Sequence, residues 1–294
     1  MSSAEKQVRK QRRKREKQAF QQAIRMELRE HKSSFLVFSV LRALVIVSLV
    51  RQLMLGSYES AFYCALALAL LYAPSWVQVQ LHIELPPALE ITVLCFIFAA
   101  EILGELQCYF VEYPHWDTML HTTSGFLAAA VGFSLVDLLN RDAKIKFQLS
   151  PLYVAIAAFC FAMTVGVLWE FVEFAADRIF LLDMQKDTVV HTISSVMLDE
   201  TNRNIPIVIS NIESASINGV DLGLGGYLDI GLYDTMEDLF VSFVGAVTFS
   251  VIGYFYLKKR GQGTFARQFI PTIREDETEQ HEEETRAPEA GDGT

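Results

Sequence analysis

The chain has 294 residues, of which 51% are hydrophobic, and its formal net charge is −10. Charge gathers at the two ends: residues 1–33 hold eleven Lys or Arg and four Glu, whereas residues 274–294 hold nine Asp or Glu and two Arg. The four cysteines show no C-x-x-C spacing, so they support neither a cysteine zinc site nor a disulfide framework. This composition favours an integral membrane protein with charged terminal segments.

Residues 1–33 form a basic N-terminal segment of charged helix or disordered arm. A nucleic-acid-binding arm is one use of such a segment, and a positive anchor on the cytoplasmic side of a first span is the use that we favour. No nucleic-acid partner is therefore expected. The basic stretch is too long for the n-region of a signal peptide, so the first apolar segment is expected to remain as a span.

Six stretches are long and apolar enough to cross a bilayer, which takes about 20 residues each. They cover residues 34–55, 60–77, 88–110, 117–139, 151–176 and 238–257. The sequence thus predicts an all-α membrane protein, a bundle of about six transmembrane helices. Two stretches are marginal, because the second contains Pro74 and the fourth begins with polar residues. A five-span arrangement is the main alternative.

Lysine and arginine are enriched in cytoplasmic loops of membrane proteins. The basic N-terminus, the "NRDAKIKF" connection (residues 140–147) and the "KKR" cluster (residues 258–260) are therefore predicted to lie inside. This orientation predicts a plasma (inner) membrane protein with both termini in the cytoplasm.

The connection of residues 178–233 is not membrane-like, and this orientation places it outside. Its short β-branched runs and its Asn218-Gly219 pair predict an extracytoplasmic insert with some β structure. We therefore divide the chain into the basic segment 1–33, a transmembrane domain 34–258 that carries this insert, and an acidic, disordered cytoplasmic tail 259–294.

Acidic residues gather toward the predicted outer ends of four spans, although only Lys and Arg were used to set the orientation. Each span contributes two polar residues three or four positions apart, a spacing that places both on one helix face. The pairs are Glu101 and Glu105, Asp117 and His121, Glu170 and Glu173, and Asp234 and Asp238. Carboxylates at this depth face a bundle interior, where they bind cations or hold protons. The pairs therefore predict one shared polar site.

Oxygen donors with one imidazole suit a divalent metal, namely Zn, Mn, Fe or Mg, and do not suit Cu(I). Glu170 and Glu173 are the predicted catalytic residues, as general bases. Glu101, Glu105 and the counter-ion candidate Arg51 complete the polar set, and Arg42 lies deeper in the first span. The predicted metal ligands are Asp117, His121, Glu170, Glu173, Asp234 and Asp238.

Each member also has a structural interpretation. Asp117 and Asp234 suit helix N-caps, and Asp234 with Glu237 matches a capping box. His121 alone would suit a structural histidine. Glu101, Glu105 and Asp177 would suit solvated positions in the headgroup region, an interpretation that we favour for Asp177. The stretch "KDTVVHTISS" repeats the Asp-Thr and His spacing of "WDTMLHTTSG". Its flanks do not match, so we interpret Asp187 and His191 as insert residues, without a duplicated domain.

Four segments together resemble the YjdF-type family of bacterial multi-pass inner-membrane proteins, a domain of unknown function. They are "WDTMLHTTSGF", "LWEFVEF", "DMQKDT" and "GGYLDIGLYDTMEDLFVSFVGA". The family's D-x-x-x-H, E-x-x-E and D-x-x-x-D motifs match the three pairs in residues 117–121, 170–173 and 234–238. The resemblance implies a membrane protein with several spans, and it implies no particular activity.

Three functions remain open at this point. A metal site could activate water against a lipid or lipid-linked substrate, although no hydrolase motif is present. A proton- or cation-coupled transporter would also use intramembrane carboxylates, although no inverted repeat is visible. A membrane scaffold or binding protein would use the charged ends and the insert for partners. The lipid bilayer itself is the one environment that all three share.

Overall fold

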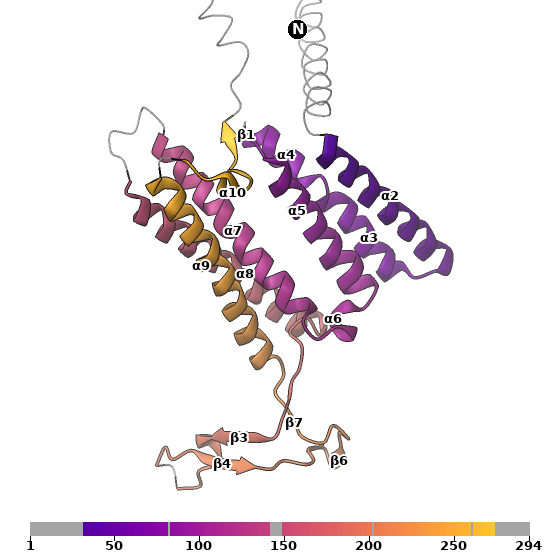
Figure 1. Cartoon of the computed structure of the whole chain (residues 1–294). Coiled ribbons are helices and arrows are strands. Elements are labelled where there is room, and N and C mark those ends of the chain that lie inside the picture. The colour runs from indigo at the N-terminus through magenta and orange to yellow at the C-terminus, as the bar shows by residue number, and fades with distance from the viewer. Residues whose placement is uncertain (1–31, 82, 142–148, 202, 260, 274–294) are drawn as a thin grey trace, which may run out of the picture. The chain divides into compact units, whose positions relative to one another are not determined.

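The computed structural model describes residues 32–81, 83–141, 149–201, 203–259 and 261–273 (Figure 1). The predicted basic segment before residue 32 and the acidic tail after residue 273 lie outside these residues. The described residues form two compact units, one made of those up to Tyr113 and from Lys259 onward, the other of those within Pro114–Lys258. Each unit is described by itself.

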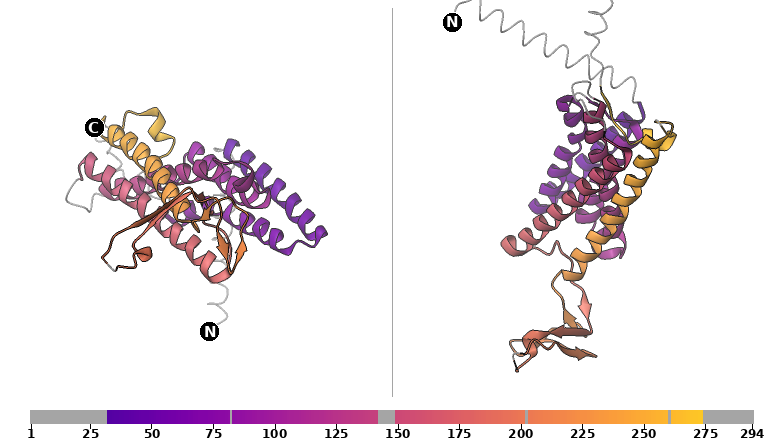
Figure 2. Two further views of the ribbon diagram at one scale, coloured as in Figure 1. Left: turned by 90° about the horizontal axis from the view of Figure 1, so that it is seen from below. Right: turned by 90° about the vertical axis from the view of Figure 1, so that its left-hand side faces the viewer.

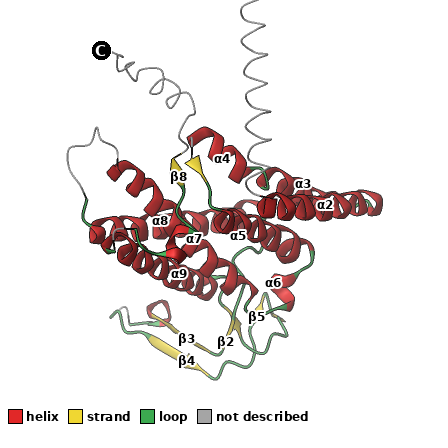
Figure 3. Ribbon diagram, turned by 45° about the horizontal axis from the view of Figure 1, so that its top comes forward, coloured by secondary structure: helices red, strands yellow, loops and turns green. Residues whose placement is uncertain are grey.

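The described chain is mostly helical, with a few short antiparallel strands (Figure 3). Five helices in the described ranges are long and apolar enough to cross a membrane: Ser33–Leu55, Tyr58–Gln80, Trp116–Asn140, Pro151–Phe180 and Leu232–Lys258. They expose many large apolar side chains, such as Val47, Leu168 and Phe171, at 67%, 55% and 63%. Exposure of this kind suits helices whose surroundings are lipid.

The described residues of the first unit up to Glu112 are mostly helical. Their elements are α2 (Lys32–Leu55), α3 (Tyr58–Leu70), α4 (Ala73–Leu81), α5 (Pro87–Phe98), η1 (Ala99–Leu106) and α6 (Tyr109–Glu112). Helix α2 packs on α3 and α5, and α3 packs on η1. The buried side chains between them are small or medium apolar ones: Val45, Cys64, Ala67, Leu71, Leu94 and Ile102. The Cys64 side chain is thus part of this core.

The stretch of residues 88–110 differs from a regular span. It begins as α5 and continues as the π-helix η1, so it is not among the five long helices. The marginal second stretch, by contrast, is one of the five, with its α3 and α4 interrupted by a turn before Pro74. The wider π-helical turn starts at Ala99 and includes Glu101 and Glu105, and π-helical turns often accompany functional positions.

The chain after the last span folds back onto the first unit. Residues 264–273, which the sequence assigns to a disordered tail, form α10 (Thr264–Arg267) and β8 (Thr272–Ile273). Strand β8 pairs with β1 (Ile83–Glu84), and Ala266 and Ile270 are buried. The order arises because these few apolar residues find a surface to cover, which the composition of the segment alone does not reveal.

The second unit is a bundle of three long helices: α7 (Trp116–Arg141), α8 (Pro151–Phe180) and α9 (Leu232–Lys258) (Figure 1). Ser150 caps α8 by accepting a hydrogen bond from the Tyr153 amide, and Pro151 occupies its first turn. This Ser-Pro start is a common helix opening, because proline needs no hydrogen-bond acceptor there.

Helices α7 and α9 touch backbone to backbone. A Cβ atom built on Gly245 would lie 2.0 Å from the Thr122 carbonyl oxygen, and one on Gly125 would lie 2.2 Å from that of Ser242. Only glycine permits such an approach, as in other membrane helix pairs with small residues at their interface. Farther along, the rings of Phe133 and Phe249 are fully buried and meet edge to face. The close approach near Gly125 and Gly245 positions the polar side chains described below.

The connection between α8 and α9 extends beyond the ends of these helices (Figure 2). It contains β2 (Val189–Val190), β3 (Thr192–Ser195), the 3-10 turn η2 (Val196–Leu198), β4 (Ile207–Ser210), β5 (Ser216–Ile217), β6 (Val220–Asp221) and β7 (Tyr227–Leu228). The strands pair antiparallel as β2 with β7, β3 with β4, and β5 with β6. Asn218 and Gly219, both with positive φ, form the two-residue turn between β5 and β6. The hairpin predicted from this Asn-Gly pair is confirmed.

Candidate functional site

The polar pairs of the second unit meet at one end of its bundle. Asp117 and His121 lie in the first two turns of α7, and Asp234 and Asp238 in the first two turns of α9. Glu170 and Glu173 lie in the second half of α8, which runs antiparallel to both. Because α8 runs opposite to α7 and α9, its second half lies beside the first turns of the other two helices. The spacing within each pair keeps both side chains on one face.

His121 lies between two carboxylates. Its Nε2 atom is 3.4 Å from Asp117 Oδ1 and 3.7 Å from Asp238 Oδ2. Both distances exceed those of ordinary N–H···O hydrogen bonds, about 2.7–3.2 Å. Two ligands of one tetrahedral zinc ion, each about 2.0–2.1 Å from the metal, lie roughly 3.4 Å apart. The spacing of these three groups therefore suits ligands that share a cation.

Glu170, Glu173 and Asp238 form a second group. One carboxylate oxygen from each lies within 4.8 Å of the other two. The three residues are only 4%, 6% and 3% exposed. Glu170 Oε2, Glu173 Oε2 and Asp238 Oδ2 are buried and have no hydrogen-bond partner among the described residues. Buried carboxylate oxygens nearly always have a partner, so these three atoms form a candidate site for a cation or a proton.

One neighbour orients a carboxylate of the second group, and another joins two helices of the cluster. The Trp169 indole Nε1 donates a hydrogen bond of 2.7 Å to Glu173 Oε1, which leaves Oε2 directed to the other carboxylates. The Ser242 hydroxyl donates to the backbone oxygen of His121 at 3.2 Å and so ties α9 to α7. Groups that fix a ligand from behind in this way are a regular part of protein metal sites.

Residues 184–186, near the start of the insert, lie against the polar cluster. Gln185 is 9% exposed, and its side-chain amide donates to the Thr235 hydroxyl. Both side chains lie near Glu170. The Lys186 amide donates to Asp234 Oδ2 at 2.7 Å. The start of the insert is therefore anchored on the polar cluster itself.

Asp234 does not cap its own helix, so the capping-box interpretation is wrong. Helix α9 begins two residues earlier, at Leu232, and the Asp234 carboxylate binds the insert. Asp229 instead accepts hydrogen bonds from the Gly231 and Tyr233 amides at the helix start. Asp117 likewise follows the first residue of α7, where a carboxylate is favoured by the helix dipole.

The cluster carries an excess of negative groups. Within the described ranges, no Lys or Arg side chain lies within 4.0 Å of its five carboxylates (Asp117, Glu170, Glu173, Asp234 and Asp238), and the neighbouring basic side chain at that distance is the His121 imidazole. The nearby Lys186 ammonium pairs with Asp183 at 3.8 Å. Like charges in a low-dielectric setting must be neutralised by protons or by bound cations.

The remaining predicted polar residues belong to the first unit. Glu101 is half-buried and Glu105 is exposed, and both lie within electrostatic reach of Tyr63 on α3. Arg51 is exposed. The Arg42 guanidinium lies 5.0 Å from the Tyr72 ring centroid and 6.0 Å from that of Phe38. It thus stacks on aromatic rings, an arrangement that favours a cation in an apolar setting.

Residues outside the cluster take structural roles in the insert. Asp177 Oδ1 and Oδ2 accept hydrogen bonds from the amides of Met184 and Gln185, so this residue holds the insert and is not simply solvated. His191 Nδ1 lies 3.0 Å from the Ile212 carbonyl oxygen, and Asp187 is exposed. The second Asp-Thr and His stretch is therefore part of the insert.

Sequence reasoning missed four residues around the cluster or along its helices. Three of them act through single side-chain contacts, for which a sequence gives no signal: Trp169, Gln185 and Ser242. Asp137, in contrast, is a carboxylate inside an apolar stretch, a feature that can be seen in the sequence. It is 4% exposed and lies 16 residues after His121, roughly 24 Å along α7.

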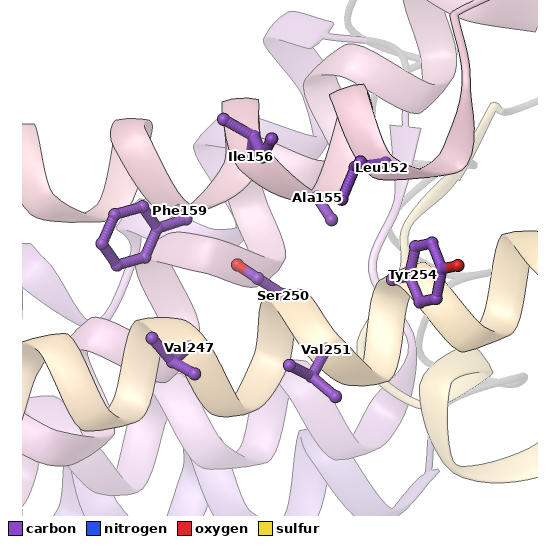
Figure 4. A pocket seen from close by; sticks show the side chains of 8 residues that line it. All are labelled: Leu152, Ala155, Ile156, Phe159, Val247, Ser250, Val251 and Tyr254. Atoms are coloured by element: carbon purple, nitrogen blue, oxygen red, sulfur yellow. The ribbon is translucent and has the colours of Figure 1, made fainter.

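An apolar pocket of about 250 Å³ lies between the beginning of α8 and the end of α9 (Figure 4). Its lining consists of Leu152, Ala155, Ile156, Phe159, Val247, Ser250, Val251 and Tyr254. Glu170 lies a further 11 residues along α8 from Phe159, about 16 Å away. The pocket lacks acidic and basic side chains, so its position and lining separate it from the polar cluster.

Five long apolar helices with a buried acidic cluster define an integral membrane protein. The chain belongs to the family described as "Predicted membrane protein (DUF2238)", whose family model matches residues 34–259. No curated protein and no solved structure matches the chain. The match agrees with the resemblance drawn from the sequence motifs, and it includes the complete second unit.

Proposed function

We propose that this protein is a membrane metalloprotein, in which the cluster of Asp117, His121, Glu170, Glu173, Asp234 and Asp238 binds a divalent cation. The observation that carries the proposal is the set of buried, unpartnered oxygens on Glu170, Glu173 and Asp238. The long His121 distances to Asp117 and Asp238 support it, because they suit shared ligation better than direct hydrogen bonding. The donor set fits Zn, Mn, Fe or Mg.

The chemistry that we propose is hydrolysis of a lipid or lipid-linked substrate. A bound divalent cation makes a water molecule acidic enough to act as a nucleophile near neutral pH. Glu170 or Glu173 would accept the proton, since both lie in the cluster on the same face of α8. The helices around the cluster expose apolar side chains such as Leu168 and Phe171, so a substrate that arrives through the membrane would itself be lipid-like.

We further propose that α5 and η1 together make a sixth crossing beside the five long helices, and that the protein lies in the plasma (inner) membrane with both termini in the cytoplasm. The Lys and Arg distribution supports this orientation. The polar cluster and the insert would then face the outer side, and the lipid substrate would belong to the outer leaflet.

Metal analysis of the purified full-length protein tests the proposal. The chain is purified in detergent without chelators, and a second sample is stripped and dialysed against Zn, Mn, Fe or Mg. We expect at least one tightly held divalent ion per chain in the wild type and its loss in Asp238→Asn. Glu237→Gln is the matched control, because Glu237 is the exposed neighbour of Asp238 and removes the same charge. A wild type that neither retains nor takes up any of the four metals would contradict the proposal.

A proton- or cation-coupled transporter is the second candidate, and Asp137 favours it, since it places a buried carboxylate toward the other end of α7. Between the two ends, however, the Phe133 and Phe249 side chains are fully buried along the helices. Flux of protons or cations into liposomes that Glu173→Gln abolishes would support the transporter over the enzyme. A scaffold would be indicated if Ala at His121 and Glu170 changed neither metal content nor any phenotype.

A further inference from the structure

Asp238 belongs to two ligand groups. One consists of Asp117, His121 and Asp238, the other of Glu170, Glu173 and Asp238, and within each the donor atoms lie within 4.8 Å of one another. We infer that the cluster holds two divalent cations, one in each group, with the Asp238 carboxylate bridging them. This inference rests on the proposed metal site, and it adds the number of ions that the site holds.

Geometry supports a pair of ions. Two ligands of a single ion with bonds of about 2.1 Å are at most about 4.2 Å apart. Among the described residues, the donors fall into two groups that share only Asp238. Paired metal ions in proteins lie about 3.5–4 Å apart, a distance that the two oxygens of one carboxylate can span. Asp238 is 3% exposed and its Oδ2 has no hydrogen-bond partner, so that oxygen is available for a ligand.

The negative charge of the two groups also supports two ions. The two groups contain four carboxylates (Asp117, Glu170, Glu173 and Asp238), a charge of −4 when all are ionised. One divalent ion leaves −2, whereas two give zero. Buried charge without compensation is costly, and no Lys or Arg side chain in the described ranges lies within ion-pair distance of these four residues. Two ions therefore neutralise the groups without requiring protons.

The two positions differ chemically. The His121 group offers one nitrogen and two carboxylates, a set that suits Zn or Fe. The Glu170 and Glu173 group offers only carboxylates, which suit Mn or Mg. Trp169 orients Glu173 in the second position alone, since it donates to Glu173 Oε1. Each position can therefore be removed by a different substitution.

Manganese loading of the full-length protein tests this inference. The stripped protein is loaded with Mn²⁺ alone, bound metal is counted by elemental analysis, and electron paramagnetic resonance reports magnetic coupling between neighbouring ions. We expect two Mn²⁺ per wild-type chain with a coupled signal. His121→Ala and Glu173→Gln should each retain one ion with an uncoupled signal, and Glu237→Gln should retain the coupled pair.

The outcomes separate the two proposals. One Mn²⁺ per wild-type chain, or two without coupling, overturns the bridged pair and leaves the metal site standing. No bound Mn²⁺, together with no Zn, Fe or Mg, overturns both. Where a variant fails to fold, as judged by gel filtration, the wild-type count and its coupling still decide.

Discussion

At the scale of the residue, the distinctive property of this protein is a set of three buried carboxylates, each with one oxygen that accepts no hydrogen bond from the described residues. Glu170, Glu173 and Asp238 are buried, yet each keeps one oxygen without a hydrogen bond. A single buried group left in this state costs about 1–3 kcal/mol, and more when it is charged. Three such atoms within one cluster are better explained by a site than by three separate structural roles.

Trp169 provides a test at the same scale. Trp169→Phe removes the hydrogen bond to Glu173 and keeps an aromatic ring, so Glu173 loses its fixed orientation. We expect the affinity for the proposed divalent ion to fall about 10- to 100-fold, as for other residues that orient a ligand. Competition with a chelator of known affinity measures this change.

The control for Trp169 is Phe171→Leu, an exposed residue on the same helix. It should leave the affinity unchanged, and the metal-free proteins should unfold at similar temperatures. Equal affinities for Trp169→Phe and the wild type would show that Glu173 does not depend on the indole.

At the scale of the element, the cluster depends on how closely α7 and α9 approach. Gly125 and Gly245 let the two backbones touch, and Ser242 then reaches the His121 carbonyl. Without this approach, Asp238 on α9 could not lie beside His121 on α7. Small residues in a membrane helix therefore serve the site although they contribute no ligand.

Gly245→Ala tests the helix contact. Its Cβ would lie 2.0 Å from the Thr122 backbone oxygen, which cannot move as a flexible side chain can. We expect a loss of about 1–3 kcal/mol in the free energy of unfolding, typical of overpacking, together with weaker metal binding. Thermal unfolding in detergent measures the first effect.

Gly166→Ala is the matched control, because its Cβ would meet Ser242 Cβ at 3.8 Å, an ordinary contact. It should be neutral or gain up to about 1 kcal/mol from the better helix propensity of alanine. If the two alanine variants unfold at the same temperature, the close contact of α7 with α9 is not the constraint described here.

At the scale of the whole molecule, the chain combines two helical units with an insert that extends from the second. The insert is not a separate attachment: Gln185 and Lys186 bind Thr235 and Asp234 at the polar cluster. A partner or substrate that moves the insert would therefore act directly on the groups around Glu170. The orientation of both units in the membrane decides which compartment reaches this cluster.

Cysteine labelling tests that orientation. Ser214→Cys lies in the insert and Gln262→Cys follows the end of α9, and both positions are exposed. In intact cells, a membrane-impermeant maleimide should label Ser214→Cys above the background of the four native cysteines, and it should label Gln262→Cys only after permeabilisation. The reverse pattern would mean that the cluster faces the cytoplasm.

The sequence by itself determined that this is a membrane protein with several helical spans, because the length of an apolar stretch is a local property. It also determined the hairpin in the insert, because the Asn-Gly pair specifies that turn locally. It also determined which residues share a helix face, since Asp117 and His121 or Glu170 and Glu173 follow helical spacing. Only the tertiary structure decided that Asp238 lies beside both groups, that α5 passes into a π-helix, and that residues 264–273 fold back onto β1. These features depend on how each helix is rotated and how closely it packs, which is set by contacts between residues far apart in the chain.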